Sequence, residues 1–167
     1  MAAVEKRCTE LAESISAILQ RTHQTVSVAE SLTSGALSSC LGATQNSSEW
    51  FLGSVVAYSS EVKFTVLGVD RGKVVTARCA GQMASGVARL LGSDLAVAVT
   101  GVGAPGPEEE EAEGTVYIAV YTQSGVHAQR YQFEGEPAEV LDKTIFQALH
   151  LLRAALTARS IEAGRNI

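Results

Sequence analysis

The sequence predicts an α/β fold: a three-layer α/β/α single domain whose mixed sheet includes one antiparallel hairpin. Helical and strand-like patterns alternate along most of the 167 residues, which is typical of a sheet covered by helices. Residues 95–100 (LAVAVT) are continuously apolar, as expected of a strand that helices cover on both faces. Two alternating segments, 115–121 and 126–133, flank Ser124-Gly125 and indicate the hairpin.

The remaining elements follow from the spacing of apolar residues and from residues that cap helices. We expect helices over 3–22, 36–41, 76–91 and 137–158, a short helix from Ser59 or Ser60 to Leu67-Gly68, and strands over 25–29 and 51–58, the second of them buried. The chain is long enough for one domain, over residues 1–160, and residues 161–167 are expected to form a disordered tail.

The net charge of −5 comes from one segment. Five of the 18 acidic residues are Glu108, Glu109, Glu110, Glu111 and Glu113, and the other 13 balance the 13 lysines and arginines. Because the sequence has no cluster of lysines and arginines that could follow a phosphate backbone, nucleic acid is not the expected partner. No apolar run reaches the ~20 residues that span a bilayer, and the charged N-terminus does not resemble a signal peptide. We therefore expect a cytoplasmic protein without a membrane partner.

Neither cofactor nor metal is expected. The three cysteines are far apart and form no CxxC pair, which disfavours a zinc site or a disulfide framework. The glutamate run is interpreted as a solvated loop, with a weak divalent-cation contact as the alternative. Residues 101–106 spell GxGxxG, but prolines, glutamates and a strand follow instead of the helix that dinucleotide binding requires.

Three strand-end loops are the places where reactive groups of such a fold gather: 29–35, 58–63 and 100–106. Ser31 precedes a predicted helix and is either a nucleophile or a turn residue beside an N-cap formed by Thr33 or Ser34. Tyr58 and Lys63 bracket the second loop. Burial of Lys63 would lower its pKa and make it a base for the serine, whereas a solvated Lys63 would not be one.

Other hydrolytic chemistries have less support. His23, His127 and His150 fall outside the three loops, so a Ser-His-Asp triad is disfavoured. Ser60 and Lys63 spell SxxK, but the chain lacks the SDN and KTG motifs of penicillin-recognising enzymes. Ser60 remains a minor alternative nucleophile.

The three loops together resemble the signatures of the CinA C-terminal domain family. Residues 29–35 (AESLTSG) resemble its AESCTGG motif, and residues 56–63 (VAYSSEVK) with 67–69 (LGV) resemble VAYSNEAK and LGV. Residues 100–106 (TGVGAPG) and 114–117 (GTVY) resemble TGIAGPGG and GTVY. The order and spacing match from about residue 10 to residue 157.

This resemblance implies a metal-independent amidohydrolase that deamidates nicotinamide mononucleotide to nicotinate mononucleotide and ammonia. The implied catalytic residues are Ser31, Tyr58 and Lys63, with Ser31 as nucleophile. The expected ligand is a small nucleotide amide, and a homo-oligomer, with a dimer favoured, is expected. The expected substrate-binding residues are Glu30, Thr33, Ser34, Gly35, Thr100, Gly101, Gly103 and Gly106.

The loops also depart from the family pattern. Leu32 and Ser34 replace the cysteine and first glycine of CTGG, and Gly103-Ala104 exchanges an alanine and a glycine. Glu136-Pro137 stands where the family has an aspartate and an arginine. Two alternatives therefore accompany the deamidase hypothesis: a hydrolase for a related amide, and a catalytically silent module that binds a nucleotide or a partner.

Overall fold

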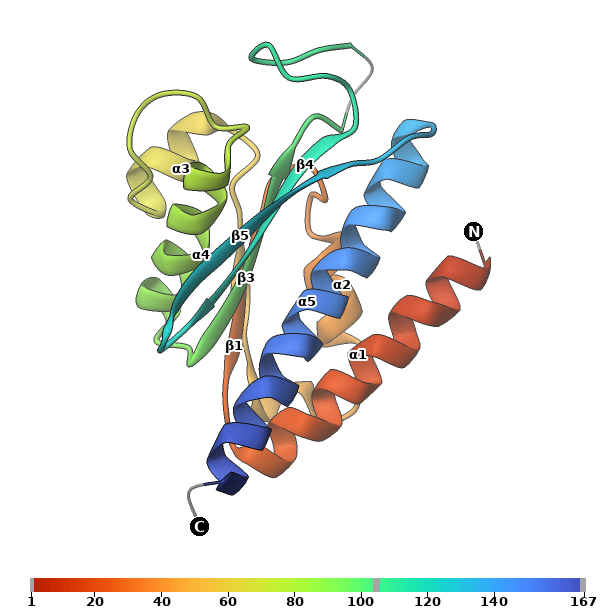
Figure 1. Cartoon of the computed structure of the whole chain (residues 1–167), viewed down its shortest axis with the longest axis vertical. Helices are drawn as coiled ribbons and strands as arrows, with labels where there is room; N and C mark the ends of the chain where they lie inside the picture. Colours follow the sequence, from red (N-terminus) through yellow and green to blue (C-terminus); the bar gives the residue numbers. More distant parts are fainter. Residues whose placement is uncertain (1, 104–105, 166–167) are drawn as a thin grey trace.

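Five strands form one mixed sheet in the order β2-β1-β3-β4-β5 (Figure 1). The computed structural model describes residues 2–103 and 106–165. The strands are β1 (Val26–Glu30), β2 (Phe51–Val56), β3 (Leu95–Gly101), β4 (Thr115–Thr122) and β5 (Gly125–Gln132). Strand β1 pairs in parallel with β2 and β3, whereas β3–β4 and β4–β5 are antiparallel. The predicted mixed sheet with one hairpin is confirmed.

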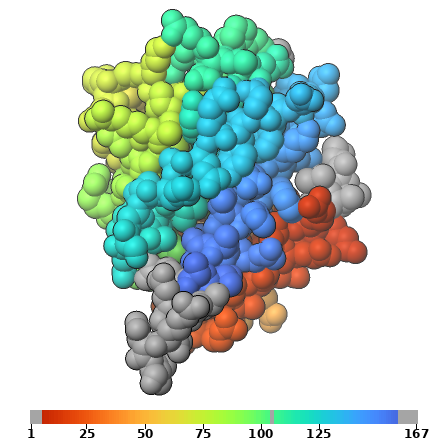
Figure 2. All heavy atoms as spheres, in the orientation of Figure 1, coloured from red at the N-terminus to blue at the C-terminus, as the bar shows by residue number. Residues whose placement is uncertain are grey.

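Helices cover both faces of the sheet and confirm the three-layer architecture. They are α1 (Ala2–Thr22), α2 (Ala36–Gly42), the 3-10 turn η1 (Ser47–Glu49), α3 (Ser60–Val66), α4 (Ala77–Leu91) and α5 (Pro137–Arg165). Helices α1, α2 and α5 lie on one side of the sheet and α3 and α4 on the other (Figure 1). In the space-filling view, the residues of β5 and α5 lie side by side on one face (Figure 2). None of the helices in the described part combines the length and apolarity needed to cross a membrane.

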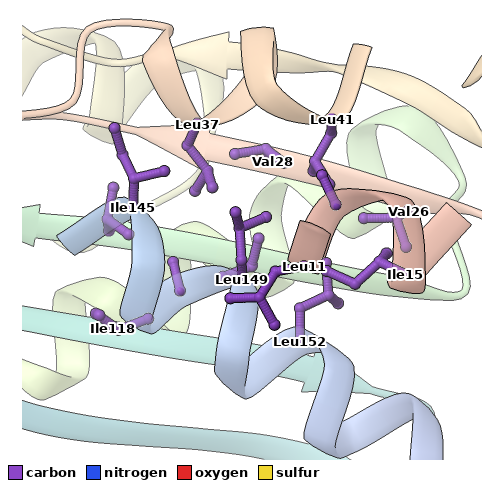
Figure 3. Close-up of a cluster of buried hydrophobic side chains, with 14 of the residues drawn as sticks. Leu11, Ile15, Val26, Val28, Leu37, Leu41, Ile118, Ile145, Leu149 and Leu152 are labelled. Atoms are coloured by element: carbon purple, nitrogen blue, oxygen red, sulfur yellow. The ribbon is translucent and has the colours of Figure 1, made fainter. Parts of the chain in front are cut away.

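The two sides of the sheet have cores of different character. On the α1/α5 side, branched aliphatic side chains such as Ile15, Val28 and Leu149 are fully buried and interdigitate (Figure 3). On the α4 side the buried residues are mostly small, with alanines on both the strands and the helix. Small side chains let α4 approach closely, and a Cβ at Gly86 would lie 2.1 Å from the Leu67 carbonyl oxygen. Because Gly86 has no side chain, the backbone at Leu67, the C-cap of α3, packs directly against α4.

Local capping sets the start of the two helices beside the site. Ser59 Oγ accepts a hydrogen bond from Glu61 N at 3.2 Å, and Thr76 Oγ1 accepts one from Cys79 N at 3.0 Å. The predicted cap at Ser59 and the predicted starting position near Thr76 are therefore confirmed. Because β1, β2 and β3 are mutually parallel within the sheet order, their carboxyl ends meet at one edge. All three predicted loops begin at that edge.

Two expectations about individual elements are wrong. Strand β2 is not buried: it is the edge strand, and its residues alternate between half-buried and exposed, with Val56 44% exposed. An apolar run cannot reveal whether a strand has one neighbour or two. Helix α5 continues to Arg165 rather than ending near residue 158, and so includes residues 161–165 of the expected tail. Residues 166–167 of that tail lie outside the described residues.

Candidate active site

A cavity of about 250 Å³ lies where the three parallel strands end. It is lined by Ser31, Leu32, Ser34, Tyr58, Ser60, Lys63, Val74, Val75, Thr100, Gly101, Gly103, Glu108 and Leu141. A larger hollow of about 520 Å³ between α1 and α2 includes none of the predicted site residues. The chemistry of the lining, rather than volume, therefore identifies the smaller cavity as the candidate site.

Ser31 is the first residue after β1. Its N–H donates to the Val99 carbonyl at 3.1 Å, which extends the β1–β3 ladder by one residue. Its carbonyl accepts from Ser34 N at 3.1 Å and closes a tight turn. Ser31 is half-buried, and its Oγ has no hydrogen-bond partner among residues 2–103 and 106–165. The backbone is thus fixed while the hydroxyl stays available to a ligand.

Glu30 organises this turn from inside the protein. Its side chain is fully buried, and Oε2 accepts from Thr33 Oγ1 at 2.6 Å, Gly35 N at 3.0 Å and Leu37 N at 3.1 Å. Oε1 accepts from Ser38 N at 2.9 Å and from Ser38 Oγ. The carboxylate therefore does the work of an N-cap for α2, whose own cap residue is a glycine without a side chain.

This arrangement corrects three of the expectations for the first loop. Neither Thr33 nor Ser34 caps the helix, because Gly35 is the cap position, with φ 100°. The amide of Gly35 is bound to Glu30 and does not face a substrate. Of the four residues of this loop that were expected to bind the substrate, only Ser34 lines the cavity. The other three, Glu30, Thr33 and Gly35, form the hydrogen bonds beneath it. Ser34 adopts φ 51°, which suits the glycine of the family pattern.

Replacement of Glu30 with glutamine is expected to destabilise the protein strongly. Glutamine replaces one carboxylate oxygen with an NH2 group, which is a donor. That donor would face groups that themselves need an acceptor, because all five partners of Glu30 donate to it. We expect a loss of about 3 kcal/mol or more, which lowers Tm by roughly 6–12 °C for a domain of this size. Thermal unfolding measures it. Glu10→Gln, at an exposed glutamate that pairs with Lys6 at 3.9 Å, is the matched control. An equal small effect in both variants would contradict the role assigned to Glu30.

Lys63 is buried, with 2% of its surface exposed, and is not the solvated helix lysine of the alternative interpretation. Nζ donates to the Ala57 carbonyl at 2.7 Å and contacts the Tyr58 carbonyl at 3.4 Å. No carboxylate in the described part of the chain forms an ion pair with it. Burial lowers the pKa of Lys63, and the neighbouring Cys79 and two glutamates oppose this only partly. The neutral, basic form of the amine is therefore reached at a lower pH than for an ordinary lysine.

Tyr58 and Ser60 lie at the mouth of the same cavity. The Tyr58 side chain is 69% exposed, and its contact with Lys63 is through the backbone carbonyl rather than the phenol. Ser60 is the exposed first residue of α3 and also lines the cavity. Placement alone thus leaves both candidate nucleophiles, Ser31 and Ser60, within the same site, and only substitution separates them.

The third loop forms the opposite wall. A Cβ at Gly101 would lie 2.5 Å from the Thr115 carbonyl oxygen, so only glycine permits this close approach to β4. A Cβ at Gly103 would lie 3.1 Å from the Leu32 Cβ, so the bulkier Leu32 fills space beside that glycine. Thr100 is buried, and its Oγ1 donates to the Val74 carbonyl at 2.9 Å. Thr100 therefore holds a neighbouring segment in place.

Gly106 does not line the cavity; its N–H donates to Glu113 Oε2 at 3.3 Å. Ala104, one of the departures from the family pattern, lies outside the described residues.

The glutamate run is partly solvated, with Glu108, Glu110 and Glu113 exposed, but it also forms specific contacts. Glu109 accepts hydrogen bonds from Val74 N and Val75 N, and Glu110 forms an ion pair with Lys73. Glu111 pairs with Arg130 at 3.2 Å and accepts from the Tyr117 hydroxyl at 3.2 Å. Within the described ranges, no group of three or more histidine, cysteine or acidic side chains is placed to hold a metal ion. The run instead forms a hairpin that brings Glu108 to the cavity wall.

Sequence reasoning missed four lining residues: Val74, Val75, Glu108 and Leu141. Leu141 lies in the first turns of α5, and the two valines precede the α4 cap. No motif marks any of them. Their position depends on how α4, α5 and the glutamate hairpin pack around the strand ends.

The fold and the site define an α/β domain with a serine- and lysine-lined cavity at the carboxyl ends of parallel strands. The model of the CinA C-terminal domain matches residues 8–156, and this chain belongs to that family.

Named relatives agree with this assignment. A CinA-like protein of Flavobacterium psychrophilum is 38% identical over 135 residues, which cover 77% of this chain and 32% of the relative. One of Citrifermentans bemidjiense is 35% identical over 162 residues, covering 93% of this chain and 39% of the relative. The chain thus spans about a third of the length of the curated relatives it matches.

Solved structures show the same fold. A CinA superfamily protein of Klebsiella pneumoniae has a TM-score of 0.87 at 27% identity, with 90% of this chain and 98% of that chain covered. A competence or damage-inducible protein of Enterobacter asburiae has a TM-score of 0.86 at 28% identity, with coverages of 89% and 98%. Both resemble this chain along nearly their full length.

Proposed function

We propose that this domain is a metal-independent amidohydrolase that uses a serine nucleophile to deamidate nicotinamide mononucleotide. One observation carries the proposal: a buried lysine with a lowered pKa shares a cavity with a serine whose hydroxyl has no partner in the described part of the chain. A serine needs a base to become a nucleophile near neutral pH, and a neutral lysine is such a base.

In the proposed reaction, Ser31 Oγ attacks the carboxamide carbon while neutral Lys63 takes the hydroxyl proton. Lys63 then delivers that proton to the departing nitrogen, so ammonia leaves and an acyl ester remains on Ser31. A water molecule attacks the ester, Lys63 takes its proton and returns one to Ser31, and the carboxylate is released. Each proton that the lysine accepts is passed on, so Lys63 is neutral again after each half-reaction.

The oxyanion requires donors that the protein does not use elsewhere. The Gly35, Leu37 and Ser38 amides are bound to Glu30, whereas the amides of Leu32 and Thr33 have no acceptor within the described ranges. The amide immediately after a nucleophilic serine is the usual oxyanion donor in hydrolases with a strand–turn–helix nucleophile. We therefore assign the oxyanion to the amide of Leu32, the lining residue that directly follows Ser31.

The substrate itself carries a cationic pyridinium ring beside its carboxamide. Glu108 brings a carboxylate to the cavity wall, where it would stabilise such a ring. These features support an amide on a cationic heterocycle over a neutral aliphatic amide.

The proposal is tested by ammonia release from nicotinamide mononucleotide with a chelator present. We expect equimolar ammonia and nicotinate mononucleotide, measured by a coupled assay and by chromatography, at a rate that the chelator leaves unchanged. Thermal stabilisation by the nucleotide without any product would instead establish the binding-module alternative. Product only in the absence of chelator would contradict the metal-independent mechanism.

A further inference from the structure

The backbone amides of Val74 and Val75, two residues that line the cavity, both bind the carboxylate of Glu109. Val74 N and Val75 N both donate to Glu109 Oε2, at 2.7 and 2.8 Å. Adjacent amides that converge on one oxygen form the kind of concavity that binds phosphate and carboxylate groups. Val74, Val75 and the neighbouring Glu108 all line the candidate active site. Both valines therefore line the site, and the Glu109 carboxylate occupies their amides.

The amide pair is held in place by contacts other than Glu109. The Val74 carbonyl accepts from Thr100 Oγ1 at 2.9 Å, and the two valine side chains are 4% and 3% exposed. These amides precede the cap residue Thr76, so they are not among the first amides of α4, one of which Thr76 itself binds. The concavity is thus preorganised and is expected to persist when the carboxylate leaves.

The hairpin that carries Glu109 is held by few contacts. Glu109 and Glu110 adopt φ values of 51° and 71°, a region that side chains with a Cβ disfavour. Glu108 and Glu111 close the hairpin through two backbone hydrogen bonds of 3.1 and 2.9 Å. Its ion pair between Glu110 and Lys73 is largely exposed, and such pairs add little stability. Release of Glu109 therefore breaks the two amide hydrogen bonds but no buried ion pair.

We propose that the Val74–Val75 amide pair is the subsite for the phosphate of the substrate, and that Glu109 competes with the phosphate for it. This inference deepens the proposed deamidase function and takes its substrate from it. A phosphate monoester carries more charge than a carboxylate and offers three acceptor oxygens, so it can displace Glu109. While Glu109 occupies the amides, the subsite is free in only a fraction of the molecules. The apparent affinity for phosphate is the intrinsic affinity multiplied by that fraction.

The test compares Glu109→Ala with Glu110→Ala. Both variants remove one negative charge and one side chain from adjacent residues with positive φ, but only the first vacates the amide pair. With inorganic phosphate as the probe, we expect Glu109→Ala to bind at least about tenfold more tightly than wild type, measured by calorimetry. The amide resonances of Val74 and Val75 are expected to shift on titration. Glu110→Ala is expected to match wild type, apart from a small salt-dependent gain.

Equal phosphate affinity in the two variants would overturn the proposal, as would a gain in Glu109→Ala without shifts at Val74 and Val75. Glu109→Gln keeps an acceptor oxygen for both amides and is expected to bind phosphate with intermediate affinity, so it tests the idea if the alanine variant does not fold. Nicotinamide riboside, which lacks the phosphate, is expected to gain nothing from Glu109→Ala. Because phosphate binding needs no turnover, these results can be read even if the protein releases no ammonia.

Discussion

We expect replacement of Ser31 with alanine to abolish ammonia release from nicotinamide mononucleotide, and Ser60→Ala to retain most of it. Ser31 continues directly from β1, its backbone is bound to Val99 and Ser34, and its Oγ has no partner in the described ranges. Ser60, by contrast, is an exposed residue in the first turn of α3. We expect a loss of about a thousandfold or more for Ser31→Ala and less than about threefold for Ser60→Ala.

The two variants are a matched pair, because each removes one hydroxyl from the lining of the same cavity. Quenched-flow detection of an acyl intermediate in wild type, and its absence in Ser31→Ala, locates the covalent step. The reverse pattern, with activity lost only in Ser60→Ala, would assign the nucleophile to α3. Full activity in both variants would refute serine catalysis in this cavity.

Replacement of Lys63 with methionine removes activity and raises stability together. Removal of an acid–base group is expected to cost at least about 100-fold in kcat. Methionine fills a similar volume without an amine that must be desolvated, so we expect Tm to rise by roughly 2–4 °C, equivalent to about 1 kcal/mol. Lys6→Met, on the exposed face of α1, is the control and is expected to change neither quantity. A lower Tm in Lys63→Met would show that the bond to Ala57 outweighs the cost of burial.

The same lysine sets the pH dependence. Because burial lowers the pKa of Lys63, its active neutral form appears, and the rate rises, at a lower pH than for an ordinary lysine. Between that lowered pKa and the ordinary value, the unfolded chain binds more protons than the folded one, so stability rises with pH in this window. We expect the Lys63→Met variant to lack this rise in the free energy of unfolding. An identical pH profile of stability in wild type and variant would contradict a lowered pKa.

The two loops that carry Ser31, Tyr58 and Lys63, and the third loop over residues 100–106, were predictable because they are local signals. Each follows a strand whose apolar or β-branched pattern is evident, and parallel strands of one sheet present their carboxyl ends at one edge. The cap at Ser59 was likewise visible, since a hydroxyl before a helix satisfies that helix's own amides. These features depend only on residues close together in the chain.

The roles of Glu30 and Glu109 were not predictable in the same way. Glu30 was expected to face the substrate, but it points inward because α2 begins at a glycine that offers no cap. Glu109 was expected to be solvated, but it reaches the amides of Val74 and Val75, which lie 35 and 34 residues earlier in the sequence. In both cases the sequence shows the carboxylate but not which backbone amides will donate hydrogen bonds to it.

The sequence by itself determined the family, the alternation of helices and strands, and which loops hold the candidate chemistry. Only the tertiary structure decided that β2 is the edge strand, that Lys63 is buried, and which carboxylates face the cavity. The reason is physical. Periodicity and capping report interactions within a few residues, whereas burial and the pairing of polar groups depend on segments that meet only after the sheet has formed.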